Sequence, residues 1–145
     1  MTPEAVERFF GRYERFFTQS LAGEVDGGAM AALYAPAFIA ASPLGVMAGR
    51  NDGTFHRALS DSYAQYRAIG TIGMRVRGVT LSPIDRLHAV AHVDWTATYG
   101  KSGQAPVDID FTVHYLMQEW EGHPRIFGWI SGDEQALLRQ HGIIP

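Results

Sequence analysis

The fold is decided by two stretches of sequence: RLHAVAHVDWTATY at residues 86–99 and VDIDFTVHYLMQEW at residues 107–120. In both stretches, apolar side chains occupy every second position and mostly polar side chains occupy the positions between them. Alternation of period two over this length predicts half-buried antiparallel strands. The linker at residues 100–106 contains two glycines and a proline, which is typical of a hairpin loop. The back half of the chain is therefore predicted to form an antiparallel sheet with one strongly apolar face.

The front half of the chain is predicted to be mainly helical. Thr2 and Pro3 are suited to begin a helix, and apolar residues then recur at helical spacing as far as Leu21. A second short helix is expected to end near Pro36, and Asn51 or Asp52 can cap a third. The remaining predicted elements are strands at residues 38–41, 74–81 and 125–131, with Phe127 and Trp129 on one face of the last, and a final helical turn capped by Asp133.

These elements predict an α+β fold over residues 1–145 as a single domain. A cone-shaped, strongly curved antiparallel sheet would wrap around the N-terminal helices and leave a cavity open at its wide end. At 145 residues, the chain is long enough to bury about two-thirds of the surface of its unfolded form.

Composition excludes several classes of function. A net charge of -3 without a basic run argues against nucleic-acid binding, which needs clustered Lys and Arg. The chain has no Cys, so disulfides and thiolate chemistry are excluded. No apolar run approaches the ~20 residues that span a bilayer, and no leader segment is evident, so no membrane partner and a cytoplasmic location are expected.

Several short motifs resemble one known framework. They are Arg12-Tyr13, Leu33-Tyr34, Ser42-Pro43-Leu44-Gly45, Gly49-Arg50 and the loop at residues 122–125. Together with the order of elements, they resemble the nuclear-transport-factor-2-like superfamily, which includes SnoaL-like cyclases and ketosteroid isomerases. The resemblance implies the cone-shaped roll (also called cystatin-like), but it specifies an activity poorly because the superfamily hosts enzymes, binding modules and dimerisation domains.

Carried over residue by residue, the resemblance implies half of an isomerase site. Tyr13 matches the position of the tyrosine that donates to the substrate oxygen, and Tyr115 falls near the second donor. The general base of the isomerases is an Asp where this chain has Ser42, and a neutral hydroxyl cannot shuttle a proton between carbons. Asp133 lies near where SnoaL-like cyclases carry an acid–base carboxylate, although a helix N-cap would equally explain it.

Large aromatic residues are expected to meet inside the cone. They are candidates to line a ligand pocket together with Ser42, and ordinary core packing is the alternative for each of them. The aromatic candidates are Tyr13, Tyr34, Trp95, Tyr99, Tyr115 and Trp129.

The opposite, polar face of the sheet carries histidines and aspartates. If Tyr99 pairs with Val107, then His92 lies directly across from His114. A metal site with two His ligands and one carboxylate is one interpretation of this face. The other is a solvated surface or the interface of a homodimer, which the resemblance favours. A His pair at such an interface would weaken association below about pH 6.

Two hypotheses of function follow. In the first, the chain is an enzyme that isomerises, cyclises or dehydrates a small, mostly apolar carbonyl compound without a cofactor. Tyr13 and Tyr115 would donate to the carbonyl, and Asp133 or Asp94 would be the base. In the second, the chain is a non-catalytic module that binds a small molecule or dimerises. A titratable group that points into the cavity would favour the enzyme.

Overall fold

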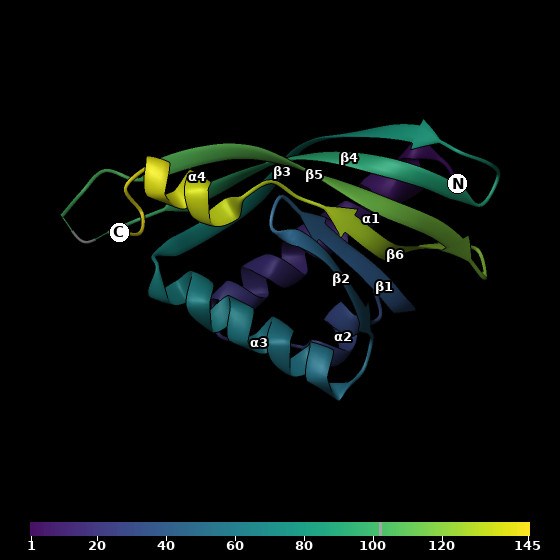
Figure 1. The fold of residues 1–145 in the computed structure, drawn as a ribbon, viewed down its shortest axis with the longest axis horizontal. Coiled ribbons are helices and arrows are strands. Elements are labelled where there is room, and N and C mark those ends of the chain that lie inside the picture. Colours follow the sequence, from purple (N-terminus) through teal and green to yellow (C-terminus); the bar gives the residue numbers. More distant parts are fainter. Residues whose placement is uncertain (102) are drawn as a thin grey trace.

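The computed structural model of the protein describes residues 1–101 and 103–145. Figure 1 shows a curved sheet that arches over the helices α1 and α3, with α4 at one end of the sheet. The helices are α1 (Pro3–Leu21), α2 (Gly27–Ala31), α3 (Gly53–Ala68) and α4 (Glu134–Gln140). The strands are β1 (Tyr34–Ser42), β2 (Gly45–Arg50), β3 (Thr71–Pro83), β4 (His88–Tyr99), β5 (Val107–Trp120) and β6 (His123–Ile130). The predicted α+β class, with a curved sheet over N-terminal helices, is confirmed.

Side-chain caps fix the beginning of the helices. The hydroxyl of Thr2 accepts the backbone N–H of Ala5 at 3.1 Å, and Pro3 occupies the first turn of α1. Asp52 caps α3, and Asp133 caps α4 by accepting the N–H of Ala136 at 3.0 Å. Each cap satisfies a backbone donor that has no partner within its helix. No helix in the described parts of the chain is long and apolar enough to cross a membrane.

The six strands that the structure describes form one sheet in the order β2-β1-β6-β5-β4-β3. The predicted pairing of Tyr99 with Val107 is present, and it places His92 opposite His114. Four of the pairings are antiparallel, whereas β1 runs parallel to β6. The loop predicted at residues 100–106 connects β4 to β5, and residue 102 of it lies outside the described residues.

The core lies between α1 and the concave face of the sheet. Val6, Phe9 and Phe10 of α1 are at most 1% exposed, and they pack in one cluster with Trp95 and Met117 of the sheet. Full burial of one such large side chain contributes about 1.5–3 kcal/mol to stability. The wide aromatic stripe of α1 is therefore what holds the sheet in its curved form.

The structure differs from the sequence-based expectation at three places. The second helix ends at Ala31 and not near Pro36, and Tyr34 already begins β1, because the backbone of Tyr34 pairs with Ile126 of β6. No strand is predicted over β2 from the sequence. Because β2 is mostly exposed on both faces, alternation could not reveal its pairing with β1.

The third difference concerns the last strand. Phe127 and Trp129 do not share a face, because the register shifts between Leu116 and Met117, opposite Phe127. Trp129 stacks on Phe38 inside the curve, whereas Phe127 contacts His88 outside. A β-bulge of this kind inserts one residue and reverses the alternation.

Candidate functional site

A cavity of about 580 Å³ lies between the concave face of the sheet, α1, α3 and the segment that leads into α4. Its size is within the range of about 300–1,000 Å³ that small-molecule sites occupy. Eleven of the 24 residues that line it are aromatic. The lining includes seven of the nine candidate residues predicted from sequence: Tyr13, Tyr34, Trp95, Tyr99, Tyr115, Trp129 and Asp133.

Three tyrosine hydroxyls meet on one wall of the cavity. The Oη atoms of Tyr13 on α1 and Tyr34 on β1 are 3.1 Å apart and share a hydrogen bond. The rings of Tyr13 and Tyr115 meet edge to face with centroids 6.1 Å apart, and the hydroxyl of Tyr115 is also a hydrogen-bond partner of Tyr13. We call Tyr13, Tyr34 and Tyr115 the phenol cluster. Its three members come from separate elements, so the curve of the sheet is what assembles it.

Tyr13 is the most acidic member of the phenol cluster. Burial raises the pKa of all three phenols, but Tyr34 and Tyr115 are raised well above the ordinary value. Hydrogen bonds from Tyr34 and Tyr115 lower the pKa of Tyr13, because both can donate to its oxygen. Tyr34 and Tyr115 are only 7% and 5% exposed, whereas Tyr13 is partly exposed. Tyr13 is thus the member whose own proton remains available to a ligand oxygen.

A carboxylate that the sequence analysis missed lies at the α4 end of the cavity. Burial raises the pKa of Glu134, and a hydrogen bond with Tyr66 partly offsets this. Burial and the neighbouring Glu134 carboxylate raise the pKa of Tyr66, and the same two causes raise that of Tyr99 to about 12. Glu134 is an exposed residue that also lines the cavity, so its carboxylate lies where the cavity meets solvent.

Glu134 could have been found from the sequence. It directly follows Asp133, whose side chain is engaged as the cap of α4, so the next carboxylate is the one left without a structural role. A Glu in the first turn of a helix is common because the helix dipole favours it. Glu134 therefore looked like an ordinary helix residue and was not singled out as a candidate base. Tyr63 and Tyr66 of α3 also line the cavity, although their helical spacing indicated only a packed face.

Two other predicted candidates lie elsewhere. Ser42 does not line the cavity: it ends β1, and its Oγ accepts the backbone N–H of Leu44 at 3.1 Å in the turn to β2. Asp94 is on the outer face of the sheet, where it accepts the hydroxyl of Thr112 at 2.7 Å. Neither the Ser42 hydroxyl nor the Asp94 carboxylate is therefore placed to act on a molecule inside the cavity.

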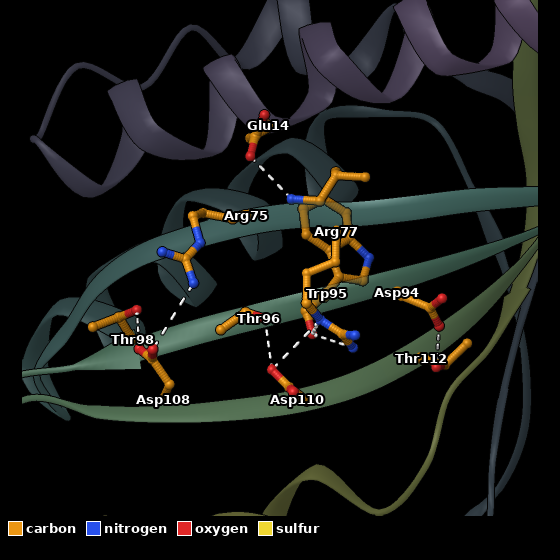
Figure 2. Close-up of polar contacts among 11 residues, drawn as sticks. Glu14, Arg75, Arg77, Asp94, Trp95, Thr96, Thr98, Asp108, Asp110 and Thr112 are labelled. Atoms are coloured by element: carbon orange, nitrogen blue, oxygen red, sulfur yellow. Dashed lines mark hydrogen bonds and ion pairs between the residues drawn. The ribbon is translucent and has the colours of Figure 1, made fainter.

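The outer face of β3, β4 and β5 carries a network of polar pairs across the strands (Figure 2). Thr96 and Thr98 donate to Asp110 and Asp108 at 2.6 Å. Arg75 pairs with Asp108 at 3.8 Å, and Arg77 of the same strand lies 3.5 Å from Asp110. Exposed pairs of this kind contribute about 0.2–1 kcal/mol each, so they set strand register more than stability.

The predicted histidine pair is present further along the same face. The Nδ1 atoms of His92 and His114 are 2.7 Å apart, and the Nε2 of His92 is 2.8 Å from the hydroxyl of Ser82. One imidazole must donate and the other accept in such a bond. Among the described residues, no group of three or more His, Cys, Asp or Glu is arranged to hold a metal ion.

The curved sheet over N-terminal helices, with an aromatic cavity between them, defines the nuclear-transport-factor-2-like class. The chain belongs to the family described as NTF2-like protein (DUF6841), whose model matches residues 3–134. The family that the sequence motifs resembled is thereby confirmed. No curated protein matches the chain.

Solved structures with the same fold share little sequence. An NTF2-like protein with a cystatin-like fold from Novosphingobium aromaticivorans is 14% identical, with a TM-score of 0.67 over 98% of this chain and 88% of the other. Aln2 from a Streptomyces species is 17% identical, with a TM-score of 0.65 over 97% and 98%. A ketosteroid isomerase-like protein from Erwinia carotovora atroseptica is 13% identical, with a TM-score of 0.60 over 90% and 94%. At these identities, the similarity establishes the fold alone.

Proposed function

We propose that the chain is a cofactor-free acid–base enzyme that acts on a small, mostly apolar carbonyl compound, by isomerisation, cyclisation or dehydration. One observation supports this more than any other: the phenol cluster and the Glu134 carboxylate line the same cavity. A base is most effective when its pKa lies near the working pH, and the pKa of Glu134 is raised in that direction. Glu134 therefore replaces Asp133 and Asp94 as the proposed base.

In the proposed reaction, Tyr13 donates a hydrogen bond to the carbonyl oxygen of the ligand. Glu134 removes a proton from the carbon next to the carbonyl, and the electrons of the broken C–H bond form the C=C bond of an enolate. Negative charge develops on the oxygen, where the Tyr13 donor, supported by Tyr34 and Tyr115, stabilises it. Return of the proton from Glu134 to another carbon of the conjugated enolate completes an isomerisation. Its transfer to a β-hydroxyl, which leaves as water while the enolate electrons form the new C=C bond, completes a dehydration.

Hydrogen–deuterium exchange tests this step without knowledge of the natural substrate. The protein is incubated with 2-tetralone, an apolar aromatic ketone, in D₂O, and loss of the α-proton signal is followed by NMR. We expect acceleration over buffer that falls about 10²–10³-fold in Tyr13→Phe and about 10²–10⁴-fold in Glu134→Gln. Asp94→Asn, which changes a carboxylate on the outer face of the sheet, is the control and should exchange as the unmodified protein does. Equal exchange in Glu134→Gln would refute the assignment of the base.

A non-catalytic binding module is the second candidate. It is favoured by the bond between Tyr13 and Tyr34, since this bond gives the Tyr34 hydroxyl a partner without a ligand. The engagement of Asp133 as a helix cap points the same way. Binding of 2-tetralone without any acceleration of exchange would select this candidate over the enzyme.

We also propose that two copies associate through the outer face of the sheet. Cations of β3 and anions of β5 are presented side by side there, as Figure 2 shows for Arg75 with Asp108. A two-fold axis through such a face can place the cations of one copy against the anions of the other.

A further inference from the structure

The charge of the cavity has one sign. Among the residues that the structure describes, none of those lining the cavity is Lys, Arg or His, whereas Asp110, Asp133 and Glu134 are among them. The side chain of Asp110 is bound to Thr96 on the outer face, and that of Asp133 caps α4, so Glu134 is the lining carboxylate with neither role. The buried phenols do not add to this charge, because their raised pKa values keep them neutral.

Two tyrosine rings lie at the acidic end of the cavity. Tyr66 and Tyr99 both interact with Glu134, and Phe111 and Trp129 also belong to the lining. The face of an aromatic ring carries partial negative charge and attracts a cation within about 6 Å of its centre. Rings and carboxylates thus favour the same kind of ligand group, and they do so at the same end of the cavity.

An anionic ligand would be poorly bound. A carboxylate or phosphate that entered the cavity would lose its water and meet no cationic side chain there, and desolvation of an uncompensated charge is costly. Two side-chain carboxylates at the α4 end would repel it further. Acyl phosphates, sugar phosphates and free organic acids are therefore disfavoured as ligands on electrostatic grounds.

We propose that the ligand of this cavity is an organic cation, namely a carbonyl compound with a protonated amine or quaternary ammonium group. The ammonium would lie at the α4 end among Tyr66, Tyr99 and Glu134, and the carbonyl would face the phenol cluster. The inference rests on the proposed function, because it takes the cavity as the substrate site. A bound ammonium would lower the raised pKa of Glu134 towards its ordinary value, so Glu134 would be ionised, as a base must be, when the ligand is in place.

Three probes of the same shape but different charge test this inference. They are phenyltrimethylammonium, neutral tert-butylbenzene and anionic benzenesulfonate. Binding is followed by the fluorescence of Trp95 and Trp129, which line the cavity, and by calorimetry. We expect the ammonium to bind about tenfold more tightly than the neutral probe and the sulfonate to bind most weakly. Equal binding of the ammonium and neutral probes, or tighter binding of the sulfonate, would overturn the inference.

Two substitutions separate the local effect from the overall charge of the chain. Glu134→Gln should weaken binding of the ammonium about tenfold and leave the neutral probe unchanged. Glu24→Gln makes the same change of charge at an exposed position between α1 and α2, outside the cavity lining, and should change neither. Equal effects of the two substitutions on the ammonium would reject the site, provided that the circular dichroism spectra of both match the unmodified protein.

The probes do not react, so their binding is independent of turnover. Preference for the ammonium without exchange of 2-tetralone protons would reject the enzyme and support the cation site. Exchange of 2-tetralone protons without any preference for the ammonium would support the enzyme and reject the cation site.

Discussion

The hydrogen bond between Tyr13 and Tyr34 can be measured as a coupling energy. Tyr13→Phe removes the oxygen that both Tyr34 and Tyr115 contact. The Tyr34 hydroxyl then loses its partner, although Tyr34 is only 7% exposed. Tyr34→Phe is milder, because the oxygen of Tyr13 keeps its bond from Tyr115. The double substitution removes both hydroxyls, so neither is left unsatisfied by the loss of the other.

The expected costs follow from the number of groups left without partners. A hydrogen bond contributes about 0.5–1.5 kcal/mol net, and an unsatisfied buried polar group costs about 1–3 kcal/mol. We therefore expect Tyr13→Phe to lower the free energy of unfolding by about 2 kcal/mol and Tyr34→Phe by about 1 kcal/mol. The double variant should also lose only about 2 kcal/mol, which gives a coupling of about 1 kcal/mol.

Urea unfolding followed by tryptophan fluorescence gives these energies, and Tyr63→Phe serves as a control outside the cluster. At about 2–4 °C per kcal/mol for a chain near this size, the same series should be visible in melting temperatures. If the costs of the two single substitutions sum to the cost of the double variant within about 0.3 kcal/mol, the reasoning is refuted. In that case water inside the cavity would be the hydrogen-bond partner of each remaining hydroxyl.

Three further outcomes are expected. Gly128→Ala should destabilise the protein by about 1–3 kcal/mol, because the new Cβ would lie 2.9 Å from a backbone oxygen of β1 and 2.9 Å from a leucine methyl of β5. The Cβ of Gly132→Ala would meet nothing within 4 Å, so this variant should be neutral. Chemical denaturation of the two variants checks this prediction. Because the folded-state pKa of Glu134 is raised above its unfolded value, the folded state holds this proton more tightly. Stability should therefore fall as pH rises from the unfolded pKa through the folded one, and thermal melts of Glu134→Gln should lose that part of the slope. If the outer face is the dimer interface, His114→Ala removes the 2.7 Å bond between the two imidazoles, so sedimentation should show weaker association than for the unmodified protein; an unchanged dimer would place the interface elsewhere.

The fold was largely predictable because its central strands are amphipathic. Every residue of β4 pairs with a residue of β5 without a shift, so a single assumed pair, Tyr99 with Val107, predicted the correct partners for the whole ladder. Prediction failed where alternation is absent or interrupted. In β2, Val46 and Met47 lie next to each other and are 76% and 64% exposed, so the strand has no apolar face to detect.

The candidate site was predictable only for large side chains. Aromatic residues such as Trp95 reveal themselves by their position on the apolar face of a strand, and most of those named from sequence line the cavity. The raised pKa of Glu134 could not be assigned in this way, because its surroundings are set by how α4 meets α3 and the sheet. The environment of a carboxylate at a helix end depends on tertiary packing, and local periodicity does not record it.

The parallel pairing of β1 with β6 also determines when the protein can fold. Residues Tyr34–Ser42 are synthesised well before their partner strand, His123–Ile130. Contacts between such distant segments slow folding. Until β6 arrives, the β6-facing edge of β1 is unpaired and Phe38 lacks its stacking contact with Trp129. Nascent chains of this protein are therefore expected to depend on chaperones until β6 has emerged, and a truncation between β1 and β6 should aggregate.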